Sequence, residues 1–475
     1  MQQTAIFWFR QDLRLKDNPA LTAAVNAGYD ILPIYILDEE NCDWPMGGAS
    51  KTWLHHSLSH LNDKLAGKLR CFTGDALKVL QKLCKEQNVT QIYWNRCYEP
   101  WRIKRDTDIK TQLNEQNVSC HSDNGSLLWE PWQILKQDKT PYKVFTPYYK
   151  KGCLNHDAPR KPLPIPNKLE LASIKSDHAV SIDGLSLLPK LPWGDEIISA
   201  WNIGEDHAYE RLDAFIEHGL SGYQDGRNYP SKPNISRMSP HLHFGEISPN
   251  QMWYAAAESG APEKDVTCFK SELGWREFSY YLLYHFPELP YKNFQDKFDA
   301  FPWEDNHEHL KAWQTGQTGY PLIDAAMREL YQTGYMHNRP RMVVGSFLVK
   351  NLLLPWQDGE KWFWDCLFDA DLASNSASWQ WVAGSGADAA PYFRIFNPIT
   401  QSEKFDPDGT YIKKYVPELK HVPAKLIHAP WEMSISEQRM HKAIIGKDYP
   451  APIVNVKETR QRALNAYATI KTSQN

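Results

Sequence analysis

The sequence has little of what marks a secreted, membrane-bound or metal-binding chain. Its eight cysteines, spread over 475 residues, form neither a Cys-x-x-Cys pair nor a Cys/His cluster, which disfavours a structural zinc site and suits reduced thiols. The longest apolar stretch, MVVGSFLVKNLLL, is interrupted by Lys350 and is too short to span a bilayer. Charged residues follow directly after the first short apolar run, so no secretory signal can be placed there. We therefore expect a cytoplasmic protein with no membrane partner.

An excess of positive charge is also missing. The formal net charge is −4, so any nucleic-acid site must be a local basic patch rather than a property of the whole chain. No Gly-x-Gly-x-x-Gly follows the first predicted strand, which disfavours a dinucleotide-binding enzyme of the Rossmann type. Internal repeats and low-complexity segments are absent as well. The chain is therefore expected to be globular, with enough length for two domains.

Aromatic residues are what the sequence has in abundance. They make up 13% of the chain and include 19 tryptophans, and tryptophan is rarely used as filler because its N–H needs a partner. One interpretation is a large helical core that is rich in aromatics. The other is a set of indoles with a chemical task.

The N-terminal part of the sequence alternates between strand and helix patterns. Strands are predicted at AIFWF, DILPIYILD, LRCFTG, QIYWN and VSCHS. Helices are predicted after Asn18-Pro19, from about Ser50 to Ala66, from Asp75 to Gln87 and after Pro100. This alternation predicts a doubly wound parallel sheet.

The remainder of the chain reads differently. Prolines crowd into the segment between Asp157 and Trp193, at positions 159, 162, 164, 166, 189 and 192, which predicts a long linker. Beyond it nearly every segment has apolar residues at three- and four-residue steps, as in TGYPLIDAAMREL. We expect an α/β domain over residues 1–130, an interdomain linker over 131–204 and an all-α helical domain over 205–475.

Ser239, followed by Pro240, is the first candidate for chemistry. This pair predicts a helix N-terminus, where free N–H groups beside Ser236 and Arg237 could cradle a diphosphate. An ordinary capped helix would give the same pattern.

The motif ELGWREF is the second candidate. On a helix, Glu272, Trp275 and Arg276 share one face. A carboxyl, an indole and a guanidinium could together meet a planar polar ligand such as a base, although Glu272 and Arg276 could equally form a surface ion pair.

The motif MHNRPRM predicts a third site at a helix start. Asn338 and Met342 would share a face, and Arg339 and Arg341 would be available for anions. Asn338 could instead be an N-cap and Met342 a core residue, and Asn375 has the same N-cap ambiguity.

Two tryptophans in SASWQWVAG are separated by a single glutamine. On a helix Trp379 and Trp381 point about 200° apart, so one ring can face the interior while the other lines a cavity. The inward ring can pass an electron, and the outward ring can stack on a base, which contributes about 1–3 kcal/mol.

These motifs together resemble a known family. WFRQDLRLKDNPAL, ELGWREF, TGYPLIDAAMREL, MHNRPRM, DADLASNSASWQW and APYFRIFNP are similar, in order and over essentially the whole chain, to the motifs of the photolyase and cryptochrome family. Within it the chain most resembles class I photolyases of cyclobutane pyrimidine dimers. The resemblance implies FAD, active as FADH⁻, which under light transfers an electron to a flipped-out dimer in ultraviolet-damaged DNA, splits the cyclobutane ring and recovers the electron. It also implies a monomer.

The resemblance carries over to flavin positions residue by residue. The matching positions are Tyr223, Ile235, Ser236, Arg237, Met238, Ser239, Arg341, Asp369, Asp371 and Asn375. Asn375 would lie at the flavin N5 atom, and Arg341 would pair with Asp369 beside the ring.

Electron transfer and DNA contacts carry over in the same way. The positions of the electron chain between surface and flavin are Trp303, Trp356 and Trp379. The positions that contact the dimer are Glu272, Trp275, Asn338, Met342 and Trp381. The candidates for phosphate contacts are Arg227, Arg276, Arg339, Arg394 and Lys404.

A second, antenna chromophore is left open. Folate-binding relatives have an Asn-Glu pair where this chain has Trp101-Arg102, which disfavours folate and leaves a deazaflavin, a second flavin or no antenna.

Three rival functions remain. The main one is a light-sensing cryptochrome, although those commonly lose part of the set Glu272, Trp275 and Met342, all present here. A (6-4) photolyase would be expected to have a histidine pair where this chain has only His337 beside Asn338. A nucleotide-binding α/β enzyme with a helical appendage would leave the tryptophans unexplained.

Overall fold

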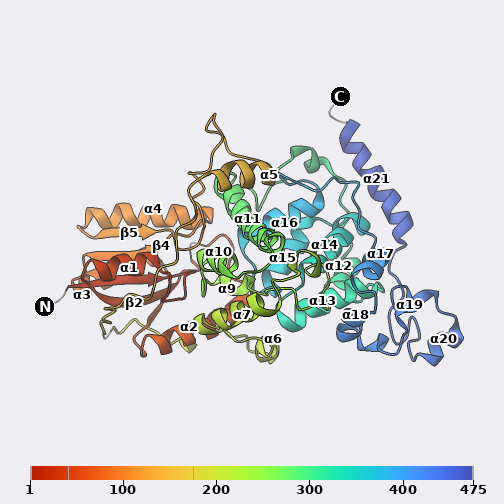
Figure 1. Ribbon diagram of the computed structural model, residues 1–475, viewed down its shortest axis with the longest axis horizontal. Coiled ribbons are helices and arrows are strands. Elements are labelled where there is room, and N and C mark those ends of the chain that lie inside the picture. The colour runs from red at the N-terminus through yellow and green to blue at the C-terminus, as the bar shows by residue number, and fades with distance from the viewer. Residues whose placement is uncertain (1–2, 41, 175, 473–475) are drawn as a thin grey trace. The chain divides into compact units, whose positions relative to one another are not determined.

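The computed structural model describes residues 3–40, 42–174 and 176–472 (Figure 1). The chain forms two compact units. The first comprises Met1–Ser221, Ser236–Pro287 and Phe368–Ala373, and the second comprises Gly222–Ile235, Glu288–Leu367 and Ser374–Asn475. Segments of the predicted helical domain belong to the first unit. These units therefore do not test the predicted domain boundaries, which stay a prediction. No helix in the described part of the chain is long and apolar enough to cross a membrane.

The first unit contains a five-stranded parallel sheet with the order β3-β2-β1-β4-β5. Its strands are β1 (Thr4–Phe9), β2 (Asp30–Leu37), β3 (Arg70–Thr73), β4 (Gln91–Asn95) and β5 (Ser119–Asp123). The helices between them are α1 (Pro19–Asn26), α2 (Gly48–Lys64), α3 (Ala76–Gln87) and α4 (Pro100–Glu115). Asn18 caps α1 and Asp75 caps α3 through their side chains. The predicted doubly wound parallel sheet is confirmed.

The alternation of side chains explains why both faces of this sheet are covered. Ile6, Trp8, Ile92 and Trp94 point to one face, where they form a buried cluster with apolar residues of α3 and α4. The intervening Phe7 and Phe9 are also fully buried. A strand that is apolar at every position is what a parallel sheet with helices on both faces requires.

From Trp193 onward the described secondary-structure elements are helices, as predicted. The longer helices are α7 (Glu205–His218), α10 (Pro249–Glu258), α11 (Glu263–His285), α12 (His307–Gln314), α13 (Pro321–Thr333), α14 (Asn338–Ser346), α15 (Trp356–Cys366), α16 (Leu372–Ala383), α17 (Pro398–Phe405) and α21 (Val456–Thr472). The short ones are α5 (Phe145–Pro147), α6 (Trp193–Ile198), α8 (Tyr223–Gly226), α9 (Ser239–His243), α18 (Thr410–Tyr415), α19 (Ala424–Ile427) and α20 (Ile435–Met440). A π-helix, η5 (Phe347–Asn351), follows α14 directly.

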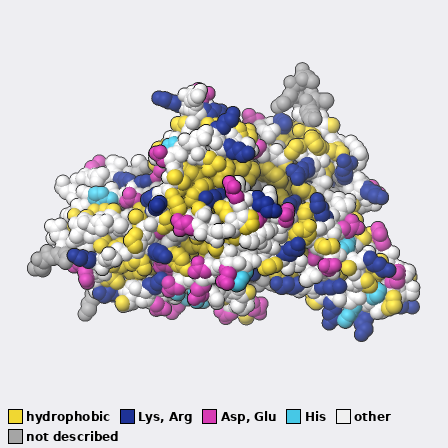
Figure 2. Space-filling view, in the orientation of Figure 1, with side chains coloured by type: hydrophobic (Ala, Val, Ile, Leu, Met, Phe, Trp, Pro, Cys, Tyr) yellow, Lys and Arg dark blue, Asp and Glu magenta, His cyan; other side chains and the backbone are white. Residues whose placement is uncertain are grey.

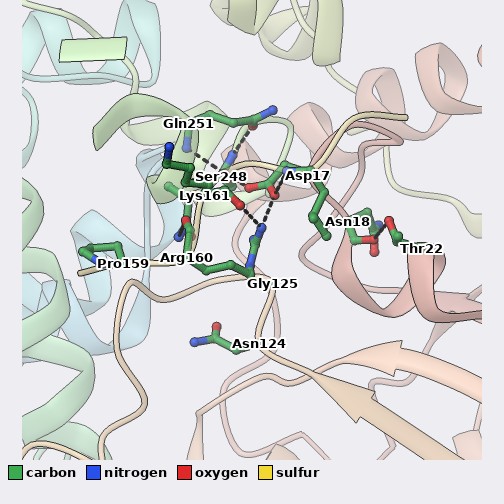
Figure 3. A network of polar contacts seen from close by, with 12 residues as sticks. Asp17, Asn18, Thr22, Asn124, Gly125, Pro159, Arg160, Lys161, Ser248 and Gln251 are labelled. Carbon is green, nitrogen blue, oxygen red and sulfur yellow. Dashed lines mark hydrogen bonds and ion pairs between the residues drawn. The ribbon is translucent and has the colours of Figure 1, made fainter. Parts of the chain in front are cut away.

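A buried carboxylate holds the proline-rich segment to the first unit. Asp17 accepts hydrogen bonds from Ser248 Oγ at 2.5 Å, from the Leu163 backbone N–H at 2.7 Å and from Arg160 Nη1 at 2.5 Å (Figure 3). The Arg160 carbonyl in turn accepts from Asn250 Nδ2 on α10 at 2.6 Å. Ser248 also caps α10 through its side chain. Burial makes each of these bonds costly to lose, so residues 160–163 are fixed in place despite their lack of regular structure.

Candidate functional site

The two neighbouring tryptophans lie on a helix, as predicted. Trp379 on α16 is 3% exposed, whereas Trp381 on the same helix is partly exposed. The Trp379 ring packs edge-on against Phe363 at 5.0 Å and Trp313 at 6.1 Å between ring centroids. Gly359 on α15 permits this packing, because a Cβ atom there would lie only 2.1 Å from the indole. One ring is therefore committed to the interior and the other reaches the surface.

The other two tryptophans of the predicted electron chain differ in depth. Trp356, the first residue of α15, is fully buried and donates from Nε1 to Asn293 Oδ1 at 3.0 Å. Trp303 is partly exposed and packs on Phe301 at 4.4 Å between ring centroids. Both lie in the second unit together with Trp379. Two buried rings and one at the surface suit the predicted path, which itself stays a prediction.

Asn375 lies inside α16, so its interpretation as an N-cap is wrong. Its Nδ2 atom donates to the Glu360 carbonyl at 3.0 Å, and the next residue, Ser376, donates from Oγ to Glu360 Oε1 at 2.5 Å. Burial raises the pKa of Glu360 to about 8. Sequence reasoning missed Glu360, which fixes the orientation of the Asn375 amide.

The motif at residues 336–342 forms the start of α14. His337, not Asn338, is the N-cap, because its Nδ1 atom accepts from the Arg339 backbone N–H at 3.1 Å. Asn338 is exposed as the first helical residue, and Met342, four residues on, is partly exposed rather than a core residue. Burial and the neighbouring guanidinium groups, Arg341 first, lower the pKa of His337 to about 3. The imidazole is therefore neutral and adds no charge to an already basic region.

A basic cluster lies in the second unit, which we define as Arg227, Arg339, Arg394 and Lys404. Burial and the charges of Arg227 and Arg394 lower the pKa of Arg339, which shows that these groups repel one another. The Arg339 guanidinium lies 4.3 Å and the Lys404 ammonium 5.2 Å from the centre of the Phe405 ring. Elsewhere Lys and Arg are interspersed with Asp and Glu, as the face drawn in Figure 2 shows. Such a cluster is a local concentration of positive charge in a chain of net charge −4, which can attract anions.

On α11 in the first unit, Trp275 is the outer ring of an aromatic stack. It stacks on Phe145 with ring centroids 3.7 Å apart, and Phe145 stacks on Tyr149 at 5.4 Å. Gly274 allows this, because a Cβ there would lie 2.6 Å from Tyr149. Phe145 was missed from the sequence, since a short helix after an irregular segment carries no periodic signal. The stack holds the Trp275 ring rigidly at a partly exposed position.

Arg276 is less available for a phosphate contact than the arginines of the basic cluster. Its Nη1 atom donates to the Ser126 carbonyl at 2.8 Å and lies 3.4 Å from Glu277 Oε1, and its side chain is 14% exposed. The buried Glu277 carboxylate accepts from the Leu128 backbone N–H at 2.8 Å, and burial raises its pKa to about 7. These contacts give Arg276 a structural task, and its contact to phosphate stays a prediction.

The segment that was predicted to bind a diphosphate is not the start of a long helix. α9 has only five residues, and Ser239 donates from Oγ to Asp369 Oδ2 at 2.5 Å instead of capping. Arg237 has a left-handed backbone with φ of 53°, and its guanidinium lies 4.5 Å from the centre of the Trp201 ring. A bend of this kind turns successive N–H groups toward one side, as anion-binding loops do.

The same unit holds carboxylates suited to a polar ring ligand. Asp371 accepts from the Tyr280 hydroxyl, and Asp369 from Ser239. Nearby, the buried His243 Nδ1 atom has no hydrogen-bond partner among the described residues. The imidazole of His243 interacts electrostatically with the carboxylates of Asp371 and Asp369. An orphaned buried atom beside two acceptors is expected where a ligand or water completes a polar site. The predicted positions Tyr223 and Ile235 belong to the second unit, the former buried and the latter partly so.

Comparisons with known proteins identify the family of this chain. A family model described as DNA photolyase matches residues 5–167, and one described as FAD binding domain of DNA photolyase matches residues 269–469. A deoxyribodipyrimidine photo-lyase of Agrobacterium fabrum is 46% identical over 98% of each chain. Cryptochrome-2 of Arabidopsis thaliana is 35% identical over 100% of this chain and 80% of its own.

A solved structure, a bacterial class III photolyase from Agrobacterium tumefaciens, superimposes with a TM-score of 0.95 at 44% identity, over 99% of this chain and 98% of the other. The chain belongs to the photolyase and cryptochrome family. FAD is its cofactor, and within the first unit the Arg237 guanidinium, the two carboxylates of Asp369 and Asp371 and the neighbouring hydroxyls fit the polar groups of a flavin dinucleotide.

Proposed function

We propose that the protein is a light-driven DNA repair enzyme that splits cyclobutane pyrimidine dimers. Its membership of the family and its likeness to a deoxyribodipyrimidine photo-lyase over nearly the whole of both chains support this reaction. The substrate is ultraviolet-damaged DNA, and the dimer is reached by flipping it out of the duplex, where its distorted stacking lowers the cost.

The observation that carries the proposal is the basic cluster beside the start of α14. Arg339 flanks the exposed Asn338 amide, and Met342 lies one turn further along the same helix. Cationic groups suit the phosphates on either side of a lesion, while a neutral amide and a thioether suit the bases themselves. His337 stays neutral and caps the helix, which fixes this arrangement.

When bound and reduced, FAD supplies one electron under light, which weakens the bonds that join the two pyrimidines. The chain's own residues hold the dimer while this happens. We propose that Trp275, braced by Phe145, and Trp381 each stack on a base, and that Glu272 and Asn338 hydrogen-bond to polar base edges. Exclusion of water by these rings keeps the electron from being lost to solvent.

The tryptophans Trp303, Trp356 and Trp379 are proposed to supply electrons from the surface. The partly exposed Trp303 can be re-reduced by a solute, and the two buried rings carry the charge inward. Asn375, oriented by Glu360, is proposed to face the reactive edge of the flavin.

The experiment is a repair assay with an oligonucleotide that contains one thymine dimer. The reduced holoprotein is expected to restore the two thymines under near-ultraviolet or blue light and not in darkness. Equal repair in darkness would discard the electron-transfer reaction, and no repair in light would discard the enzyme.

A light-sensing cryptochrome is the second candidate, favoured by the 35% identity to cryptochrome-2 over the whole of this chain. It predicts flavin photoreduction without repair and without preference for dimer-containing DNA. The same oligonucleotide assay separates the two functions.

A further inference from the structure

One buried lysine is not used by the proposed reaction. Lys350 lies on the π-helix η5 and is 1% exposed. Lysine is almost never fully buried without a partner, and burial together with the charge of Arg394 lowers the pKa of its ammonium to about 7. Its Nζ atom donates to the Arg394 carbonyl at 3.0 Å and lies 5.2 Å from the centre of the Tyr392 ring. A neutral amine also has N–H groups, so this bond survives in either protonation state.

The partner of Lys350 lies in the loop 384–397, which contains neither helix nor strand. The loop follows α16, and the carbonyl of Trp381 on that helix accepts from the Ala390 backbone N–H at 3.2 Å. Near its end, the Phe396 backbone N–H donates to Ser346 Oγ at 3.2 Å. Between these two attachments Arg394 is exposed, and only the bond from Lys350 reaches its backbone from another element among the contacts described. The loop therefore connects a proposed base-stacking ring to a member of the basic cluster.

The helix that carries Lys350 is itself anchored. Arg462 on α21 donates from Nη2 to the Asn351 carbonyl at 2.8 Å, and Asn351 Nδ2 donates to Thr459 Oγ1 at 2.9 Å. π-helices are rare in proteins, and those that do occur are often found at functional sites. The π-helix that carries Lys350 is anchored to α21 through the next residue, Asn351.

We propose that Lys350 is a positioning residue that fixes the loop 384–397. The fixed loop keeps Arg394 and Trp381 in position to contact the damaged strand. The proposal rests on the proposed function, because it assigns the loop to DNA recognition. It predicts that Lys350 acts on the affinity for damaged DNA through Arg394, and not on the flavin.

The test is Lys350→Met, which keeps the length of the side chain and removes the donor. The holoprotein variant is expected to bind a dimer-containing duplex about tenfold more weakly, because the loop carbonyl is left unsatisfied or the loop moves. The visible flavin spectrum and the rate of photoreduction are expected to stay at wild-type values, which separates positioning from general damage to the fold. The exposed Lys420 provides a matched control, and Lys420→Met is expected to bind like wild type.

A double-mutant cycle shows whether Lys350 acts through Arg394. In an Arg394→Ala background, Lys350→Met is expected to cost less than about twofold, because coupled residues are not additive. Full additivity would overturn the proposal. Should Lys350→Met fail to fold, Ser346→Ala removes another hydrogen bond to the loop, the one from the Phe396 backbone N–H. This variant is expected to weaken binding about threefold, and wild-type affinity would overturn the proposal. If the wild type itself neither binds nor repairs the dimer, the proposed function fails; if it does both and Lys350→Met binds equally well, only the positioning role fails.

Discussion

The packing of Trp379 against Gly359 makes a sharp prediction. In Gly359→Ala the new Cβ would lie 2.1 Å from the indole, so the ring or α15 must shift. Replacing a helical glycine by alanine gains about 1 kcal/mol of helix propensity, whereas overpacking a buried site costs about 1–3 kcal/mol. We expect a net loss of up to about 2 kcal/mol in the free energy of unfolding, measured by denaturant titration.

The displaced ring should also change the photochemistry. If Trp379 passes electrons inward, a shifted indole slows photoreduction of the flavin, followed as the loss of its visible absorption under blue light with an external reductant. Repair by enzyme that was reduced beforehand should be nearly unaffected, because that reaction does not use the three tryptophans that pass electrons to the flavin.

Gly274→Ala is the matched control. It is also a helical glycine against an aromatic ring, with 2.6 Å between the new Cβ and Tyr149, but that ring supports the Trp275 stack. We expect a similar loss of stability with weaker binding of dimer-containing DNA and unchanged photoreduction. Wild-type stability and photoreduction in Gly359→Ala, or identical defects in both variants, would refute the reasoning.

Three further predictions follow from the described contacts. Trp303→Phe should slow photoreduction but leave repair by pre-reduced enzyme intact, and loss of both would mean that the indole is structural. Arg339→Ala and Arg394→Ala should each weaken binding to all sequences and reduce the slope of log affinity against log salt concentration by about 1; an unchanged slope in titrations at several salt concentrations would remove that residue from the phosphate contacts. Burial raises the pKa of Glu360 to about 8, so the folded chain keeps a proton that the unfolded chain releases. Stability from this group is present at low pH and is lost as the pH rises toward 8. Glu360→Gln should therefore flatten the fall in thermal stability between about pH 4.5, the ordinary pKa of the group, and about pH 8, and a curve parallel to wild type would show that Glu360 is ionised in the fold.

Much of the fold could be predicted because its signals are local. Short apolar runs separated by capped helices are sufficient to specify a parallel sheet, since each strand must be buried on both faces. Asn18 caps its helix as its sequence position predicts, because a cap depends on residues only two or three positions away. The opposed exposures of Trp379 and Trp381 also follow from helical geometry alone.

Some local signals were ambiguous, and packing decided them. Asn375 has the sequence context of an N-cap but lies inside α16, because the helix begins earlier and its amide is bound by the Glu360 carbonyl. At the start of α14 two polar residues compete for the cap, and His337 takes it while Asn338 stays exposed. Intrinsic preference for a cap is worth only about 1 kcal/mol, so tertiary contacts override it.

By itself the sequence determined the parallel sheet, the helical half and the family to which the chain belongs, because repeating apolar patterns and ordered motifs lie along the chain. Only the tertiary structure revealed that Phe145 braces Trp275, that Gly359 makes room for Trp379 and that Lys350 holds the Arg394 carbonyl. Each of these pairs joins residues far apart in the sequence, and contacts of that kind are set by how side chains fill a close-packed interior.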